Sequence, residues 1–335
     1  MKIWRFHSHG DLSNLKLEEG PIPTPAAGEA LIQIEYAALN PADAFVVQGL
    51  YPRSGPPPLC VGRDGAGVIV KAAQGGRFKE GDRVVVLRSQ VGVTHDGTLA
   101  EFAAVPEASL APLPSGWTFA EGAAGPLVLL TSWVALVNVG ALEPGMTVFV
   151  NGASGGVGSA SVMLARAMGA RVVAASRSQE KRARLKELGA TIVVDSSDPD
   201  RMEEEAKNAL GEARADIVVE NLGGPYLQSS VNLVKEGGRI AVVGLLAGYA
   251  SELMLGNLIF KRARIEGVAV GSLTPTQAQD AWAKIIGHLD RTGAKPIIDR
   301  VFPMENVLEG FARLAIGPMG KVVIDVAGGG IWRAH

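Results

Sequence analysis

The chain has 335 residues, which is enough for two domains and too many for one ordinary core. Hydrophobic residues make up 47% and charged residues 20%, a composition typical of globular proteins that excludes a largely disordered chain. The net charge of -2 shows no basic excess of the kind that nucleic-acid-binding proteins carry, and the single cysteine, Cys60, excludes an internal disulfide and a four-cysteine zinc site.

The segment up to about Gly122 predicts a β-rich domain. Short runs rich in Val, Ile and Leu are bounded there by Gly, Pro and Asp, as barrel or sandwich strands usually are: GEALIQIEYAALN, GAGVIVKAA, GDRVVVLRSQ and GTLAEFAAVP. A loop rich in proline and glycine, GLYPRSGPPPLCVGRDG, lies between them. Loops of this kind, held on a rigid scaffold, often carry functional side chains.

Neither the N-terminus nor an apolar internal stretch predicts a membrane segment. The sequence MKIWRFHSHGDLSNLKLEEG has no long apolar run and no small-residue cleavage site, so we expect no secretory signal and a cytoplasmic location. An uncharged stretch from Gly122 to Leu142 is long enough to span a bilayer. Because it contains Pro126 and Asn138 and lacks basic flanks, we interpret it as a buried helix.

From Thr147 the pattern changes to alternating strands and helices. The apolar strands TVFVNG, RVVAAS, TIVVDS, ADIVVENLG and RIAVVGLL are separated by helical segments. This alternation predicts an α/β domain with a doubly wound parallel sheet, covered by helices on both faces. After about Ile265 the alternation is lost, and we expect a helix (TPTQAQDAWAKIIGHLDRTGA), a strand (IIDRVFP), a short helix and a closing strand (GKVVIDV).

The sequence NGASGGVG joins the first of these strands to its helix. It is a relaxed form of the dinucleotide-binding pattern G-x-G-x-x-G, with Ala153 in the first glycine's place and Gly155 and Gly158 in the other two. Without a Cβ, the glycines let the backbone approach a pyrophosphate, which the free N–H groups of the helix bind. The alternative is a tight turn without a ligand. The turn residues expected to bind the cofactor are Ser154, Gly155, Gly156 and Val157.

The second strand ends in Ser176, Arg177 and Ser178. Proteins that use NAD usually have an Asp or Glu there, which binds the ribose hydroxyls and would repel the extra phosphate of NADP. Hydroxyl and guanidinium groups bind that phosphate, and a charge-assisted hydrogen bond contributes roughly 1.5–3 kcal/mol. We therefore expect NADP(H), bound by Ser176, Arg177 and Lys181. Alternatively, Arg177, Lys181 and Arg182 form the solvated start of a helix.

Several motifs follow one another in a characteristic order along nearly the whole chain: LNPADAFVVQGLYP, GRDGAGV, FKEGDRVVV, GTLAEFAAVP, LLTSW, NGASGGVG and PMGKVVI. In this order they resemble the medium-chain dehydrogenase/reductase superfamily, in particular its zinc-free quinone oxidoreductase-like branch. The resemblance implies a GroES-like catalytic domain, residues 1–122 and 266–335, interrupted by a Rossmann NADP-binding domain, residues 123–265. It also implies a homodimer, joined through an edge strand near RIEGVAV.

The zinc positions of the family differ in this chain. Where zinc-dependent members place a Cys, the chain has Asn40, and where their GHEGAG motif supplies His and Glu, it has Arg63 and Asp64. A guanidinium cannot bind a metal, so we expect no metal site. Without the Lewis acid that ionises an alcohol, simple alcohol oxidation is disfavoured. Hydride transfer from NADPH to a quinone or an α,β-unsaturated carbonyl remains.

The resemblance also assigns roles to single residues. Tyr51 would act in catalysis by donating to the carbonyl oxygen that gains negative charge; alternatively it packs on nearby prolines. Asn40 would contact the nicotinamide ribose or the substrate, as a second catalytic and cofactor-binding residue. Lys321 would reach the cofactor; alternatively it is a surface lysine. The remaining residues expected near the cofactor are Thr131, Asn221 and Gly244.

The expected function is that of an NADPH-dependent, zinc-independent oxidoreductase that reduces a quinone or another conjugated carbonyl, a small-molecule substrate. Two alternatives stay open: a reductase of 2-enoyl thioesters of CoA or acyl carrier protein, and a non-catalytic NADPH-binding protein. Nothing in the sequence predicts a nucleic-acid or membrane partner. The role of Arg63 is also open, because it could sit in the active-site cleft and favour an anionic substrate, or pair with Asp64 or Asp43.

Overall fold

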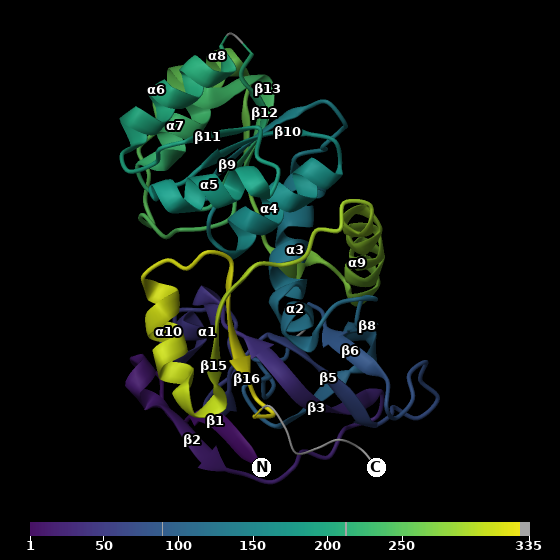
Figure 1. The fold of residues 1–335 in the computed structure, drawn as a ribbon. Helices are drawn as coiled ribbons and strands as arrows, with labels where there is room; N and C mark the ends of the chain where they lie inside the picture. Colours follow the sequence, from purple (N-terminus) through teal and green to yellow (C-terminus); the bar gives the residue numbers. More distant parts are fainter. Residues whose placement is uncertain (89, 212, 329–335) are drawn as a thin grey trace. The chain divides into compact units, whose positions relative to one another are not determined.

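Two hydrophobic cores lie in two compact units of the chain (Figure 1). Unit 1 consists of residues 1–127, 273–282 and the segment that begins at Lys295, and unit 2 consists of residues 128–272 and 283–294. The structure is a computed structural model that describes residues 1–88, 90–211 and 213–328.

Unit 1 is built on strands that pair antiparallel, except for the parallel pair β15 and β16. Its larger sheet has the strand order β15-β16-β3-β5-β6-β8, with β7 also paired to β3, and its smaller sheet has the order β2-β1-β4. The last strand, β16, pairs with β3, so the C-terminal segment returns to the N-terminal sheet. The strands are β1 (Lys2–Phe6), β2 (Leu15–Glu19), β3 (Glu29–Ala38), β4 (Leu59–Cys60), β5 (Asp64–Lys71), β6 (Arg83–Val86), β7 (Phe102–Pro106), β8 (Leu110–Pro112), β15 (Ile298–Pro303) and β16 (Lys321–Asp325).

In the core of unit 1, alternate side chains of these strands pack against the helix α10. Ile32 and Ile34 of β3 pack in the same buried cluster as Val322 of β16. Phe311, on the apolar face of α10, completes the cluster. The alternation explains why every second position of β3 must be apolar, since successive side chains point to opposite faces of a sheet. The helices are α1 (Pro41–Val47), α2 (Phe119–Ala124) and α10 (Val307–Ala315), while α9 (Pro275–Asp290) continues from unit 1 into unit 2.

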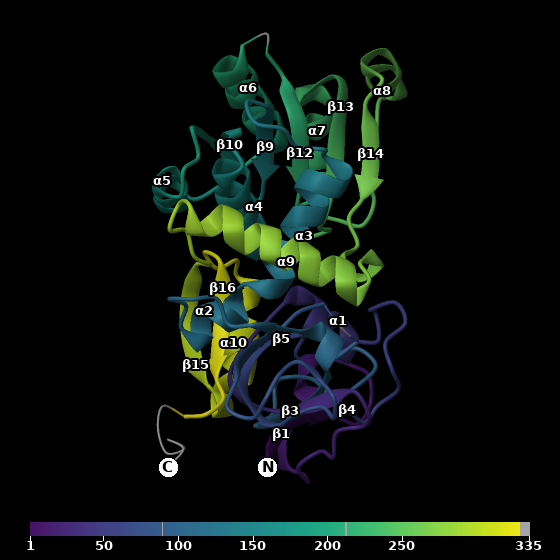
Figure 2. The same cartoon turned by 90° about the vertical axis from the view of Figure 1, so that its right-hand side faces the viewer.

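Unit 2 contains one sheet, in which all pairs of neighbouring strands are parallel. The order is β11-β10-β9-β12-β13-β14, which is the doubly wound order 3-2-1-4-5-6 of the Rossmann fold. The Rossmann fold predicted for this part of the chain is therefore confirmed. The strands are β9 (Thr147–Asn151), β10 (Arg171–Ala175), β11 (Ile192–Val194), β12 (Ala215–Glu220), β13 (Val234–Val242) and β14 (Arg264–Gly267). Figure 2 shows β14 beside β13 at the edge of the sheet, the edge strand that the sequence predicts near RIEGVAV.

The helices of unit 2 cover both faces of this sheet. Because parallel crossovers are right-handed, the helices that follow β9 and β10 lie on one face and those that follow β11, β12 and β13 on the other. On the second face, Phe149 and Val218 of the sheet pack with Met202 and Val231. Figure 1 shows α6, α7 and α8 gathered there. The helices are α3 (Pro126–Trp133, which begins at the end of unit 1), α4 (Gly156–Ala167), α5 (Gln179–Glu187), α6 (Pro199–Leu210), α7 (Tyr226–Leu233) and α8 (Leu255–Lys261).

The sequence suggested a single helix over the uncharged stretch 122–142, and this prediction is wrong. It forms the end of α2, then α3 from Pro126, then a π-helical segment from Val134 to Val139. Pro126 ends α2 because its ring replaces a backbone N–H and clashes with the preceding turn. Among the described residues, no helix is both long enough and apolar enough to cross a membrane.

Candidate active site

The glycine turn of unit 2 lies between β9 and α4. Gly158 is required by packing, because a Cβ there would lie 2.2 Å from the carbonyl oxygen of Gly152. Gly155 is not required by the fold: its φ of -72° suits any residue, and its Cβ would meet nothing closer than the Gly152 oxygen at 3.7 Å. The space that Gly155 leaves open lies at the N-terminus of α4, whose first N–H groups lack helical partners. This cradle fits a phosphate group.

A buried carboxylate holds the carboxyl ends of β9 and β12 together. Glu220 is fully buried and accepts hydrogen bonds from Asn151 Nδ2 at 3.0 Å, from the Leu222 N–H at 2.7 Å and from Ser230 Oγ. This is the point where the strand order reverses, and ligands of such sheets bind there. Sequence reasoning missed Glu220, although a carboxylate that ends the apolar run ADIVV is a visible signal.

Asn221 and Gly244 meet beside this carboxylate. Asn221 Nδ2 donates to the carbonyl oxygen of Asn151 at 2.7 Å, whereas its buried Oδ1 accepts from no residue in the part of the chain that the structure describes. A Cβ on Gly244 would lie 2.2 Å from the Asn221 carbonyl oxygen, so only glycine fits. An orphaned buried acceptor is costly, and a donor from a bound cofactor would satisfy it.

The end of β10 carries the predicted phosphate ligands. Ser176 is buried, and its Oγ donates to Ser154 Oγ at 3.3 Å, so the structure brings these two predicted residues together. Arg177 is exposed, and its side chain has no hydrogen bond or ion pair with any residue that the structure describes. The Lys181 N–H donates to Ser178 Oγ at 3.4 Å, at the start of α5.

Arg182 is not part of a solvated helix start, which the sequence left as an alternative. Its Nη1 donates to the Ser176 carbonyl oxygen at 2.7 Å and forms an ion pair with Asp195 at 3.2 Å. Although burial opposes ionisation, hydrogen bonds from Ser197 and the nearby Arg182 hold the pKa of Asp195 below its ordinary value. The Asp195 carboxylate is therefore ionised, and its negative charge is balanced by Arg182. This balance lowers its repulsion of a phosphate bound near Arg177.

The remaining predicted residue of unit 2, Thr131, is buried on α3. The open cradle at Gly155 and the orphaned oxygen of Asn221 both fit a dinucleotide cofactor. The residues that would hold it are the turn from Ser154 to Val157, Ser176 and Arg177 on the phosphate side, and Asn221.

Unit 1 contains a buried polar cluster of Asn40, Asp64 and Lys321, referred to below as the Lys321 cluster. Lys321 Nζ donates to Asn40 Oδ1 and, at 2.9 Å, to Asp64 Oδ2. Asn40 Nδ2 donates to the same Asp64 oxygen at 2.9 Å, and the Leu127 N–H donates to Asp64 Oδ1 at 3.0 Å. Lys321 is only 3% exposed, so the alternative of a surface lysine is wrong. The cofactor contacts expected of Asn40 and Lys321 stay predictions.

Asp43 and Arg63 lie next to this cluster. The Asn40 N–H donates to Asp43 Oδ2 at 2.8 Å, while the buried Asp43 Oδ1 has no hydrogen-bond partner among the described residues. Complete burial raises the pKa of Asp43 to about 6, against the opposing effect of Arg63. Arg63 forms no ion pair with Asp43 or Asp64 and instead donates from Nη1 to the Tyr51 hydroxyl oxygen at 3.0 Å. Neither pairing suggested from the sequence occurs.

Asn40, Arg63 and Asp64 stand where zinc-dependent dehydrogenases of this family have metal ligands, and their contacts here do not suit a metal ion. The oxygens of Asn40 and Asp64 both bind the ammonium of Lys321, a cation that belongs to the chain itself. Burial raises the pKa of the Cys60 thiol, which disfavours the thiolate that a metal requires. In residues 1–88, 90–211 and 213–328, no three His, Cys, Asp or Glu side chains lie close enough to hold a metal ion.

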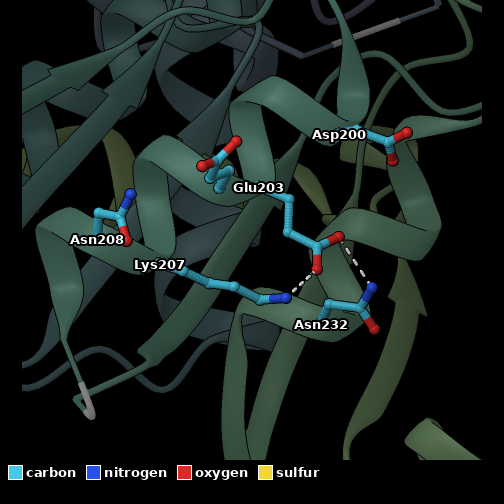
Figure 3. A pocket seen from close by; sticks show the side chains of 6 residues that line it. Asp200, Glu203, Lys207, Asn208 and Asn232 are labelled. Atoms are coloured by element: carbon cyan, nitrogen blue, oxygen red, sulfur yellow. Dashed lines mark hydrogen bonds and ion pairs between the residues drawn. The ribbon is translucent and has the colours of Figure 1, made fainter.

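A separate hollow lies on the surface of unit 2, between α6 and α7. Figure 3 shows its lining side chains, among them Glu203, Lys207 and Asn232. Lys207 forms an ion pair with Glu203, and Asn232 Nδ2 donates to Glu203 Oε2 at 2.9 Å. These polar groups satisfy one another, so nothing in this hollow indicates a ligand.

Comparisons with known proteins identify the family. Residues 26–115 match the model of the alcohol dehydrogenase GroES-like domain, and residues 156–289 match that of zinc-binding dehydrogenases. The quinone oxidoreductase of Pongo abelii is 30% identical over 97% of both chains. Among solved structures, a quinone oxidoreductase from Thermus thermophilus, also solved in complex with NADPH, is 31% identical with a TM-score of 0.79, over 97% of this chain and all of that one. An NAD-dependent alcohol dehydrogenase is 30% identical with a TM-score of 0.87, again over 97% of this chain and all of that one.

The chain is an oxidoreductase of the NAD(P)-binding medium-chain dehydrogenase/reductase superfamily and belongs among its quinone oxidoreductase-like members.

Proposed function

We propose that this chain is an NADPH-dependent, zinc-independent reductase that transfers a hydride to a quinone or another conjugated carbonyl compound. The observation that carries the proposal is the binding of the Lys321 ammonium by Asn40 and Asp64. An ammonium ion at these positions has no empty orbital with which to ionise an alcohol. An acceptor that is already electrophilic does not need that activation.

The overall reaction consumes one acceptor, one NADPH and one proton, and yields the reduced acceptor and NADP⁺. When bound, NADPH supplies the hydride, which carries two electrons. The acceptor's carbonyl oxygen gains negative charge as its π bond breaks. The Tyr51 hydroxyl would donate a hydrogen bond to this oxygen and then its proton. A preorganised donor of this kind accelerates a reaction by about a hundredfold or more.

The preference for NADPH over NADH is supported by the end of β10. Ser154 and Ser176 present hydroxyl groups there, and the exposed guanidinium of Arg177 is not engaged by any described residue. The nearby carboxylate of Asp195 is neutralised by Arg182. The NADPH complex known for the Thermus thermophilus relative agrees with this preference.

Formation of a homodimer, in the cytoplasm, completes the proposal. Among the described strands, β14 pairs on one side only, with β13, and such edges are normally covered. The helix and loop before it expose several large apolar side chains, which a second copy would bury. The most exposed of these residues are Leu246, Tyr249, Met254, Ile259 and Phe260.

The test is NADPH oxidation by the purified protein with a panel of quinones, enones and 2-enoyl-CoA esters. We expect turnover of quinones and enones, unchanged by a metal chelator, and no oxidation of simple alcohols. Turnover of enoyl-CoA esters alone would favour the thioester reductase. NADPH binding without turnover of any acceptor would favour the non-catalytic alternative. Loss of activity in chelator, together with one bound zinc per chain, would overturn the proposal.

A further inference from the structure

Arg63 is a buried cation without a counterion in contact. It is only 8% exposed, and it forms no ion pair with the carboxylates that the structure describes. Among the described residues, its side chain makes one hydrogen bond, from Nη1 to Tyr51, and its buried Nε has no acceptor. Burying a charge without a partner is expensive, so a protein keeps such an arrangement where a ligand completes it.

The two acids that could serve as counterions are engaged differently. Asp64 accepts hydrogen bonds from Lys321, Asn40 and the Leu127 N–H, which engage both of its oxygens. Asp43 acts on Arg63 only through space, since no hydrogen bond or ion pair joins them among the described contacts. The guanidinium of Arg63 is therefore left without a direct carboxylate partner among the described residues, and an anionic ligand can take that place.

The backbone fixes where this charge lies. Gly62 precedes Arg63 with a φ of +108°, and a Cβ there would lie 2.7 Å from Thr98 Oγ1. The Tyr51 backbone is tied as well, because its N–H donates to Phe45 and its carbonyl oxygen accepts from Ser54. The guanidinium carbon also lies 5.2 Å from the centre of the Tyr51 ring. These contacts hold the backbone on both sides of the pair.

The direction of the Arg63–Tyr51 bond determines what the tyrosine can do. A guanidinium has donors only, so the Tyr51 oxygen must accept. No described residue accepts the Tyr51 O–H, which is therefore available to a ligand. A cation on the phenol oxygen draws electron density from the O–H bond and makes it a stronger donor. The pair presents a strong O–H donor beside a positive charge that no described carboxylate contacts.

We infer that Arg63 and Tyr51 together form an anion site for the oxygen that gains negative charge on reduction, the oxygen of a hydroquinone monoanion or an enolate. The inference rests on the proposed function and names the role of Arg63 in it. The hydride adds two electrons to the conjugated acceptor, and its carbonyl π bond breaks to leave the charge on oxygen. Tyr51 gives that oxygen its proton and regains one from water, while Arg63 stabilises the charge throughout. Arg63 acts in two ways, by polarising the Tyr51 O–H and by adding its own positive charge to the site.

The test uses p-nitrophenolate, an aromatic oxyanion that resembles a hydroquinone monoanion and whose absorbance reports binding without turnover. Its Kd is measured for the wild type, Arg63→Met, Tyr51→Phe and the double variant. We expect each single variant to bind about tenfold or more weakly. Because the two residues act as a unit, the double variant should bind no more weakly than the weaker single variant. Losses that multiply in the double variant would overturn the inference.

Two further variants control for folding and for charge. Arg83→Met removes another arginine of unit 1 that lies over an aromatic ring, Phe119, and should leave the Kd unchanged. Arg63→Lys keeps a positive charge but loses the planar donor fork, and it should recover part of the binding lost in Arg63→Met. Wild-type binding by Arg63→Met would refute an anion site at this residue.

The same variants separate this inference from the proposed function. If the wild type binds p-nitrophenolate through Arg63 and Tyr51 but oxidises no NADPH with any acceptor, the proposed function fails and the anion site stands. If the wild type reduces conjugated acceptors and Arg63→Met does so at the same rate and with the same p-nitrophenolate affinity, the function stands and the anion site fails.

Discussion

The ammonium of Lys321 donates to Oδ2 of Asp64 across 2.9 Å, and both side chains are almost fully buried, with 4% and 1% of their surfaces exposed. Burying two charges costs much of what their attraction returns, so such a pair is weak evidence for stability by itself. Removing one partner is different, because the other charge is left buried and unpaired. The Lys321 cluster should therefore tolerate substitution poorly.

Lys321→Met should lower the free energy of unfolding by about 3–5 kcal/mol, because it leaves the buried Asp64 carboxylate without its cation. Chemical denaturation of the variant and the wild type measures this change. The matched control is Lys295→Met, which removes a half-exposed lysine 3.2 Å from Glu121 and should cost less than about 1 kcal/mol. Equal effects of the two substitutions would contradict the burial argument.

Asp43 should make stability depend on pH. Burial raises its folded pKa from the ordinary 3.8 to about 6, so the folded protein holds a proton that the unfolded chain releases. The contribution of Asp43 is therefore full below about pH 4 and is lost as the pH rises to about 6. The linkage amounts to about 3 kcal/mol.

Asp43→Asn removes this titration and keeps an oxygen that can accept from the Asn40 N–H. The difference in unfolding free energy between the variant and the wild type should grow in favour of the variant by about 3 kcal/mol between pH 4 and pH 7. Denaturant titrations at several pH values measure it. Parallel pH profiles for the two proteins would show that Asp43 ionises normally in the fold.

Arg177→Ala should weaken NADPH far more than NADH. The lost guanidinium is the proposed partner of the extra phosphate, and a charge-assisted hydrogen bond corresponds to about tenfold or more in affinity. Fluorescence titration gives both dissociation constants. Arg184→Ala, which removes another exposed arginine on α5, is the control and should change neither. A wild type that binds NADH as tightly as NADPH would refute the phosphate assignment.

Phe260→Glu should convert the proposed dimer into a monomer. Phe260 is 85% exposed on α8, and a carboxylate there would have to lose its hydration if a second copy covered it. Sedimentation at micromolar concentration measures the mass. Ile316→Glu places the same charge on an exposed apolar position of unit 1 and should leave the dimer intact. A monomeric wild type would contradict the assembly.

The Rossmann sheet could be predicted from the sequence because its signals are local. Each strand is a short apolar run, and the glycines of the turn after β9 are confined to eight successive residues, NGASGGVG. The break at Pro126 was also visible locally, yet the lack of charges between 122 and 142 suggested one helix. The polar residues of that stretch are accommodated by hydrogen bonds such as Ser132 Oγ to the Val128 carbonyl oxygen.

The polar contacts of the candidate site could not be predicted in the same way. Lys321 and Asn40 are 281 positions apart, and only the pairing of β16 with β3 brings them together. The partner of Arg63 depends on the path of the loop that carries Tyr51, which no periodic pattern describes. The sequence analysis therefore offered two acids, Asp43 and Asp64, as partners of Arg63, and did not consider the Tyr51 phenol that Arg63 contacts.

Steady-state NADPH oxidation by the wild type and Tyr51→Phe, with a quinone and a 2-enoyl-CoA ester as acceptors, tests the proposed chemistry most directly. The substitution should leave the NADPH affinity nearly unchanged and lower kcat by about a hundredfold or more on the thioester. Quinone reduction should suffer less, because the product gains aromaticity and needs less help from the donor. Tyr249→Phe, at a 75% exposed position, is the control and should behave as the wild type. Unchanged rates for Tyr51→Phe on every acceptor that the wild type reduces would contradict the account.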